Sequence, residues 1–325
     1  RFYDLVIEVA IVRPGPIQGG MVHPYLKRRS GEEPVDYPSD EVRQALQRTL
    51  GVPIFQEQVM QLAMLAADFT AGEADQLRRA MAAWKRKGGL GPFHERLVGR
   101  MVAKGYSSDY AERIFKQIEG FGEYGFPESH AASFALLVYV SAWLKHHHPD
   151  AFLAALLNSQ PMGFYAPAQL VRDARAHGVV VLPVDVTRSQ WDTVLEPEAG
   201  AAPGDALRPV RLGFSRISGF PEDAAQRLVA ARAEAPFAGA EDLARRAALD
   251  AHALGLLAQA DALKPLSGHR HRAAWAVAGV DTRATPLLRR TRTHEADAEL
   301  AAPDVAQDLL ADYRSTGLSL ATHPL

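Results

Sequence analysis

Cysteine is absent from the 325 residues, so the chain has no disulfide framework and no cysteine-ligated zinc site. No signal peptide is visible at its start. The longest apolar run, residues 134–144, is too short to cross a bilayer. We therefore expect a cytoplasmic protein without membrane contact. The chain opens on Arg1, in a segment typical of a domain interior, and we interpret it as a fragment.

Neither sign of charge dominates. The 36 Lys and Arg residues and 38 Asp and Glu residues give a net charge of -2. That balance neither favours nor excludes nucleic acid, because nucleic-acid binding depends on local charge. The length is typical of two domains, and 47% hydrophobic with 23% charged residues is typical of a globular protein.

An Asp-x-Asp pair is also lacking. Two-metal nucleotidyl transfer needs paired carboxylates to hold Mg²⁺. The nearest pattern, Glu73-x-Asp75, lies on a predicted helix, where capping explains it. We therefore expect neither a catalytic residue nor a metal ligand in this chain.

The first half is predicted to be helical. A helix over residues 55–69 is indicated by one apolar stripe, formed by Val59, Leu62, Ala63 and Ala66. Thr70 and Glu73 form the capping box of the next helix. That helix is expected to bury Ala74, Leu77, Met81 and Trp84. Asp109 is the predicted N-cap of a further helix, which Gly120 ends.

The stretch GFGEYGFPESHAASFALL, residues 120–137, joins a turn rich in glycine to a helix over residues 130–148. Large apolar residues cover most of the circumference of this helix, and a helix that is apolar all round is predicted to be buried. Glu128, Ser129 and His130 would then lie at its start, where free backbone amides point outward.

The second half changes character. VVVLPVDV, residues 179–186, is strand-like, and residues 211–263 indicate two helical hairpins. Residues 264–305 are polar and irregular, and a last helix is expected over residues 305–313. The predicted fold is mainly α: a helical domain, a small α/β segment, tandem hairpins and an irregular C-terminal linker. The expected boundaries are 1–157, 158–265 and 266–325.

Five cations follow Leu77 with no acid among them: Arg78, Arg79, Lys85, Arg86 and Lys87. At about 100° per residue, Arg78 and Lys85 share one flank of the helix, and Arg79 and Arg86 share its outer face. Two rows of cations suit a polyanion such as a triphosphate or a nucleic-acid backbone. A solvated helix face is the competing interpretation.

Two further groups could bind anions. Arg13 lies in a rigid RPGP turn that could aim it into a cleft, and His130 could donate to an anion beside a helix N-terminus. A surface arginine and a simple cap are the alternatives. The triplet at residues 146–148 cannot close on one metal ion, because consecutive helical side chains point about 100° apart.

ISGFPEDAA, residues 217–225, has the form of a helix-hairpin-helix turn, which binds DNA phosphates through backbone amides. Its candidate DNA-binding residues are Ser218, Gly219 and Phe220. Pro221 replaces the second glycine of the usual turn and removes one N–H donor. A purely structural hairpin is therefore the alternative.

QADAL, residues 259–263, superficially resembles a sliding-clamp-binding peptide. Such peptides work in exposed, extended segments, whereas this one lies in a helical pattern with Leu256, Leu257 and Leu263 as expected core residues. We predict a structural role for it.

Taken in order, these segments resemble one family. VRPGPIQGGMV, FQEQVMQLA, ADQLRRAM, FGEYGFPESHAASFALL and WLKHHHPDAF follow one another as in bacterial C-family DNA polymerases, the alpha subunits of DNA polymerase III and their relatives. The resemblance covers essentially the whole chain. It implies a fingers domain over residues 1–157, a helix-hairpin-helix region over residues 158–265, and a linker toward a missing OB-fold domain.

Finer segments, NSQPMGFYAPAQLVRDARAHGV and PVDVTRSQWD, resemble the error-prone branch of the family. The clamp-binding peptide of the replicative branch has no counterpart in residues 279–300. The resemblance therefore implies part of an error-prone DNA polymerase of damage-induced mutagenesis and translesion synthesis. A replicative alpha subunit and a non-catalytic DNA-binding scaffold are the alternatives.

The resemblance also implies site residues. Arg78 and Arg79 match the fingers arginines that face the incoming nucleotide's triphosphate, and the proposed nucleotide-binding set is completed by Lys85, Lys87, Arg13, Ser129 and His130. The implied cofactor is Mg²⁺, held by palm carboxylates that would precede Arg1, so this chain alone is expected to be inactive. The implied partners are primer–template DNA, a deoxynucleoside triphosphate and accessory mutagenesis proteins, with the sliding clamp reached indirectly.

Overall fold

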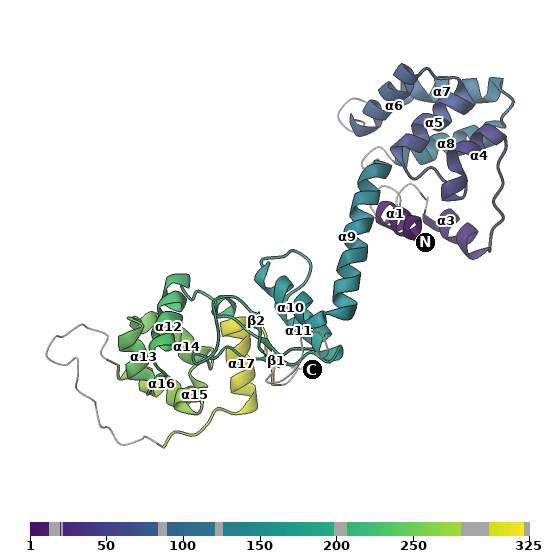
Figure 1. Ribbon diagram of the computed structural model, residues 1–325. Helices are drawn as coiled ribbons and strands as arrows, with labels where there is room; N and C mark the ends of the chain where they lie inside the picture. The colour runs from purple at the N-terminus through teal and green to yellow at the C-terminus, as the bar shows by residue number, and fades with distance from the viewer. Residues whose placement is uncertain are drawn as a thin grey trace. The chain divides into compact units, whose positions relative to one another are not determined.

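The computed structural model of the chain describes residues 1–12, 20, 22–83, 90–120, 126–197, 207–280 and 299–321. The fold is mainly α, as the sequence predicts. Two compact units, residues 1–142 and 143–325, each enclose a hydrophobic core of their own (Figure 1). The first predicted boundary, at residue 157, lies further along the chain than this division.

The first unit is built of helices. They are α1 (Phe2–Ile11), α3 (Val22–Ser30), α4 (Asp40–Leu46), the short 3-10 helix η1 (Gln47–Thr49), α5 (Gln56–Ala67), α6 (Ala71–Ala83), α7 (Gly91–Ala103), α8 (Ser108–Gly120) and α9 (Glu128–His147), which continues into the second unit.

Helix α5 is at the centre of the first unit, where it packs against α4, α6 and α7. The apolar stripe that predicts it is buried as expected, with Val59, Leu62, Ala63 and Ala66 all in the core. The same core takes Leu77 and Met81 from α6. The spacing of apolar residues therefore identified both helices and the faces that they bury.

A buried glutamine joins the start of α5 to its neighbours. The Oε1 atom of Gln58 accepts hydrogen bonds from the amides of Ile54 (2.9 Å) and Phe55 (3.1 Å). Its Nε2 atom donates to the hydroxyl of Thr49 (2.8 Å) and to the carbonyl of Ala45 (3.3 Å). The side chain thus satisfies the free amides that precede the helix.

One of the two predicted helix caps is confirmed. The Glu73 amide donates to Thr70 Oγ1 (3.3 Å), and the Thr70 amide donates to the Glu73 carboxylate (2.8 Å). For α8 the prediction of Asp109 is wrong, because Ser107 accepts the hydrogen bond from the Tyr110 amide (3.2 Å). Asp109 lies instead in the first turn, where a negative charge favours the helix dipole.

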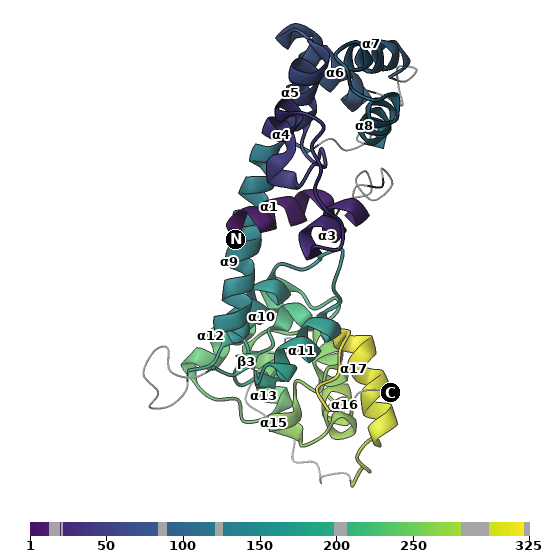
Figure 2. The same cartoon turned by 90° about the vertical axis from the view of Figure 1, so that its right-hand side faces the viewer.

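Helix α9 is not the buried helix that the sequence predicts. Its first half lies beside α1 (Figures 1 and 2), and Ala131 and Ala135 are buried. The large apolar residues from Leu136 to Leu144 are exposed, however, Leu137 by 59%. The prediction is wrong for this part of the helix, because periodicity reports what a helix can bury but not whether a partner is present.

The second unit contains a small sheet and several short helices. Its elements are α10 (Pro149–Asn158), α11 (Pro167–Ala176), β1 (Val181–Leu182), β2 (Val194–Leu195), β3 (Val210–Arg211), the 3-10 helix η4 (Phe214–Arg216), α12 (Glu222–Glu234), α13 (Ala240–Arg246), α14 (Ala251–Gln259), α15 (Lys264–Ser267), α16 (Arg270–Ala278) and α17 (Val305–Thr316).

Strand β3 is the centre of the sheet. It pairs in parallel with β1 and antiparallel with β2. The strand-like stretch at residues 179–186 thus contains a strand, although a short one. Arg211 of β3 is buried and donates from Nε to the Glu196 carboxylate (2.7 Å) and from Nη1 to the Pro183 carbonyl (3.0 Å), which ties the three segments together.

The C-terminal part differs from the predicted irregular linker. Helices α16 and α17 both pack against α14, and Ala273 and Leu318 belong to the core of the unit. Arg270, buried among them, pairs with Asp308 and Asp312 of α17. These helices are too short for their apolar residues to show a clear helical period in the sequence. Their position is fixed by packing against α14. Residues 281–298 lie outside the described residues.

The clamp-like QADAL stretch is structural, as predicted. Gln259 ends α14, and Leu257 and Leu263 are fully buried. Among the described residues, no helix combines the length and the apolar character that crossing a bilayer requires.

Candidate nucleotide and nucleic-acid interface

Helix α6 presents the two predicted triphosphate-facing arginines outside its buried face, Arg78 on the flank and Arg79 on the outer side. Ala74, Leu77 and Met81 point into the core, as the sequence predicts. Arg78 is half-exposed, and the side chain of Arg79 is 75% exposed. Both guanidinium groups are therefore accessible to a ligand in solution.

Asp75 engages both arginines. Arg78 donates to one carboxylate oxygen from Nε (3.0 Å) and Nη2 (2.8 Å), and Arg79 Nε lies 2.7 Å from the other oxygen. The hydrogen bond from Arg78 lowers the pKa of the Asp75 carboxyl. No acid lies among the cations that follow Leu77, but Asp75, about one helical turn before Arg78 and Arg79, partly neutralises these two arginines. The i, i+3 and i, i+4 spacing could have revealed this pairing in the sequence.

Three cations of the predicted cluster, Lys85, Arg86 and Lys87, lie outside the described residues. So do Arg13 of the RPGP turn and Trp84, which was predicted to be buried. Neither Arg78 nor Arg79 lines the cavity beside α11, the one between α7 and α8 or the one on α3, all of which are bordered by described residues. The role of the two arginines toward a triphosphate stays a prediction.

Ser129 and His130 lie in the first turn of α9, and both are exposed. The His130 ring meets Phe126 and Phe134 edge-on, at centroid distances of 4.8 and 4.7 Å. The Ser129 carbonyl accepts a hydrogen bond from the Ser133 hydroxyl (3.0 Å). The two side chains are thus brought to one accessible helix start, with His130 held between aromatic rings.

Two carboxylates also lie at this helix start. The Glu128 amide donates to the Glu57 carboxylate (2.9 Å). The Glu128 carboxylate accepts a hydrogen bond from the Tyr3 hydroxyl (2.7 Å) and pairs with Arg48 (3.0 Å). One amide that was expected to be free is therefore occupied by an acid, which makes the site less favourable for an anion than a bare helix N-terminus.

The predicted DNA-binding turn joins η4 to α12. Gly219 adopts a φ of +75°, a conformation that favours glycine, and it is exposed. Phe220 is only 5% exposed, and its ring lies against Phe214 at 5.7 Å. Its side chain supports the turn and does not face solvent.

Two amides of the turn are already used. The Ser218 amide donates to the Ser315 carbonyl (2.7 Å), and the Phe220 amide donates to the Ile217 carbonyl (3.2 Å). Asp223 in the first turn of α12 pairs with Arg227, and this hydrogen bond lowers the pKa of its carboxyl. A phosphate could therefore contact only the remaining backbone around Gly219 in this turn. That contact stays a prediction.

The comparisons with known proteins agree on the two halves of the chain. Residues 1–105 match the family described as bacterial DNA polymerase III alpha subunit finger domain. Residues 178–273 match a helix-hairpin-helix motif.

Curated relatives align with the whole chain. Proteins named "Error-prone DNA polymerase" from Alkalilimnicola ehrlichii, Bordetella bronchiseptica and Pseudomonas aeruginosa are 62%, 60% and 58% identical to it over 324, 326 and 325 residues. Each alignment covers 100% of this chain, which spans 31%, 30% and 31% of those proteins.

Proposed function

We propose that this chain, which matches the bacterial DNA polymerase III alpha subunit finger domain over residues 1–105 and a helix-hairpin-helix motif over residues 178–273, supplies the fingers and the helix-hairpin-helix region of an error-prone DNA polymerase. The complete enzyme would add deoxynucleotides to a primer 3′ end. Identity of 58–62% along the whole chain to proteins of that name supports the error-prone branch over a replicative alpha subunit.

The proposed role of α6 rests on one observation, that Arg78 and Arg79 both form ion pairs with the single carboxylate of Asp75. A triphosphate carries more negative charge than one carboxylate and offers more acceptor oxygens. The arriving triphosphate would therefore draw the guanidinium groups away from Asp75. Cations placed at the transferring phosphates stabilise the charge that develops during phosphoryl transfer.

Mg²⁺ would be held elsewhere in the protein. Among the described residues, no group of three or more His, Asp or Glu side chains could hold a metal ion. The acids of α6 are already engaged, Asp75 with Arg78 and Arg79, and Glu73 with Arg96 and Arg100. The part of the chain that the structure describes therefore does not offer a site for Mg²⁺.

The hairpin turn at Gly219 would contact the backbone of primer–template DNA, with a deoxynucleoside triphosphate as the second substrate. Contacts of this kind are independent of base sequence and weaken with salt. We also propose that accessory mutagenesis proteins recruit the enzyme and that it reaches the sliding clamp indirectly. The enzyme would carry out translesion synthesis after DNA damage, in the cytoplasm.

The test of the proposal is Arg78→Ala in the full-length enzyme, assayed by steady-state primer extension. Loss of a hydrogen bond to a charged group costs roughly 1.5–3 kcal/mol, so we expect kcat/KM for the nucleotide to fall about 10–100-fold. Both a higher KM and a lower turnover are expected. Unchanged kinetics would refute the role of Arg78.

Two further variants sharpen the test. Arg29→Ala removes another exposed arginine, paired with Asp4 at 2.8 Å, and should leave the kinetics unchanged. Asp75→Asn should lower the KM for the nucleotide, because it removes the carboxylate that competes with the triphosphate. The purified 325-residue chain should show no primer extension, and extension by this chain alone would contradict the placement of the catalytic site elsewhere.

A further inference from the structure

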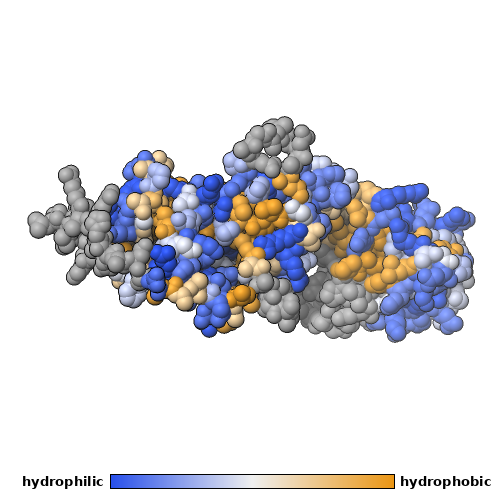
Figure 3. Space-filling view, turned by 90° about the horizontal axis from the view of Figure 1, so that it is seen from below, coloured by the Kyte–Doolittle hydropathy of each residue, from blue (hydrophilic) through white to orange (hydrophobic). Residues whose placement is uncertain are grey.

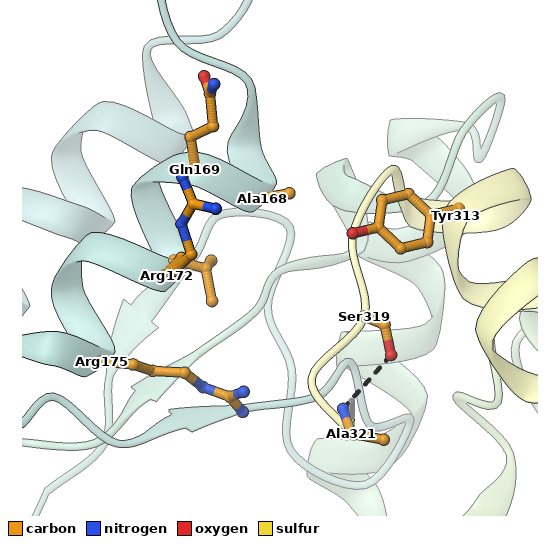
Figure 4. Close-up of a pocket in the computed structure, with 8 residues that line it drawn as sticks. Ala168, Gln169, Arg172, Arg175, Tyr313, Ser319 and Ala321 are labelled. Atoms are coloured by element: carbon orange, nitrogen blue, oxygen red, sulfur yellow. Dashed lines mark hydrogen bonds between the residues drawn. The ribbon is translucent and has the colours of Figure 1, made fainter. Parts of the chain in front are cut away.

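A cavity of about 570 Å³ lies inside the second unit, between α11 and the end of α17 (Figure 4). Helix α11 contributes Gln169, Arg172 and Arg175 to its lining. Tyr313 of α17 and Ser319 after it form the facing side. The cavity is distinct from α6 and from the turn at Gly219.

The lining carries two arginines and no carboxylate. Arg172 and Arg175 are one helical turn apart, both are exposed, and neither makes an ion pair or side-chain hydrogen bond with another described residue. The acid between them, Asp173, pairs with Lys145 at 2.9 Å. Asp312, which precedes Tyr313, is held by Arg270. The two arginines therefore lack the local acid that Arg78 has.

Tyr313 adds an aromatic surface to these charges. It is 39% exposed, and its hydroxyl points toward α11 (Figure 4). Ser319 is turned to its own segment, because its hydroxyl donates to Asp312 (2.7 Å) and accepts from the Ala321 amide (3.3 Å). Cations that follow a phosphate backbone, together with an aromatic ring on which a base can stack, are what single-stranded nucleic acid requires.

We propose that this cavity binds single-stranded nucleic acid, with Arg172 and Arg175 on backbone phosphates and Tyr313 against a base. A site for one strand is a further contact beyond the hairpin turn. The inference rests on the proposed function for one point, the identity of the strand as DNA.

The experiment measures binding of a fluorescent oligothymidylate to the full-length protein by anisotropy, without nucleotide. The double variant Arg172→Ala, Arg175→Ala should weaken binding at least about tenfold and reduce the slope of log K against log salt by about 1.4, because each single-strand phosphate contact contributes about 0.7. Tyr313→Leu should weaken binding about fivefold or more, as expected for the loss of one stacked base.

The matched control is Arg188→Ala, Arg208→Ala, which removes the same charge from exposed positions of the same unit and should bind normally. Circular dichroism confirms that each variant is folded. Equal binding by the arginine variant and the control would overturn the proposal. Displacement of the oligonucleotide by equimolar inorganic triphosphate, with Tyr313→Leu unchanged, would also overturn it in favour of a phosphate site. The readout needs no catalysis, so its failure is distinguishable from failure of the polymerase proposal.

A second, independent observation is the exposed surface of α9 within the first unit. We call the α9 surface the set Phe134, Leu136, Leu137, Val138, Tyr139 and Val140, each 42–59% exposed. The helix carries no charged residue from Ala131 to Leu144. Apolar side chains also lie open on the face drawn in Figure 3. An exposed apolar surface of this kind marks an interaction site.

We infer that the α9 surface is covered by the part of the full-length polypeptide that lies outside these 325 residues. The chain spans only 31% of its relative from Alkalilimnicola ehrlichii, so the greater part of the protein is available to cover it. The absence of charge fits a permanent contact within one polypeptide, since interfaces that open and close are more polar than cores.

The absence of native cysteine makes a direct test possible. Leu137→Cys is labelled with a maleimide in the 325-residue chain and in the full-length protein, whose other cysteines are first replaced. Labelling should be at least about tenfold slower in the full-length protein, as expected for a buried thiol. Glu234→Cys, at an exposed position that ends α12, should react equally in both. Equal rates for Leu137→Cys, or protection that depends on protein concentration and so indicates a second copy, would overturn the inference.

Discussion

Replacement of Gln58 by leucine tests how the start of α5 is held. The substitution keeps the size of the side chain but removes all four of its hydrogen bonds. The amides of Ile54 and Phe55 and the hydroxyl of Thr49 then lose a partner in a place where all three residues are fully buried.

The expected cost follows from those groups. Each buried polar group left without a partner costs roughly 1–3 kcal/mol. The two amides therefore cost about 2–6 kcal/mol, and the more favourable burial of leucine offsets about 1.5–3 kcal/mol of this. We expect Gln58→Leu to lower the free energy of unfolding by the difference, about 0.5–3 kcal/mol, which corresponds to a fall in Tm of roughly 2–9 °C for a unit of this size.

The measurement is urea and thermal unfolding of the 325-residue chain, followed by circular dichroism. Gln61→Leu, one turn later on a partly exposed position of the same helix, makes the same chemical change and should alter Tm little. If Gln58→Leu were as stable as the wild type, the hydrogen bonds of Gln58 would not hold this junction, and the argument would fail.

Two other changes have definite expected results. The hydrogen bond from the Thr70 amide is the main cause that lowers the pKa of Glu73 from 4.5 to about 2. Because the pKa is lower in the folded state, the ionised carboxylate stabilises the fold fully above pH 4.5. This stabilisation is lost as the pH falls toward 2. Glu73→Gln should therefore flatten the fall in stability between those pH values, and urea midpoints at pH 5 and pH 3 would contradict this if both proteins lost the same stability. A Cβ at Gly213 would overlap backbone atoms of Trp191 and Asp192, so Gly213→Ala should lower Tm, whereas Gly239→Ala, with open space around it, should not; equal melting curves would show that the backbone yields freely.

Local features of the first unit follow from the sequence. The stripe through Val59 and Leu62 and the buried face through Leu77 and Met81 are set by a period of about 3.6 residues, which any reader of the sequence can count. The box of Thr70 and Glu73 is equally local, because both partners lie within one turn. The sequence predicts Asp109 as a cap where the structure has Ser107, because both residue types cap helices. The backbone geometry of the folded chain places Ser107 at the cap position.

Contacts between distant segments could not be read in this way. The contact of the Glu57 carboxylate with the start of α9 joins residues 71 positions apart. Burial of Phe220 against Phe214 depends on the turn between them, and the cavity between α11 and α17 depends on the packing of α16 and α17 around α14. None of these leaves a periodic signal.

The sequence by itself determined that the chain is mainly helical, which faces of α5 and α6 are apolar, and which family its motifs resemble. Only the tertiary structure decided that the Glu57 carboxylate meets the start of α9 and that α9 is exposed from Leu136 to Leu144. The physical reason is that periodicity encodes what a segment is able to bury, while the partner that buries it, or the acid that neutralises it, is supplied by the folded chain around it.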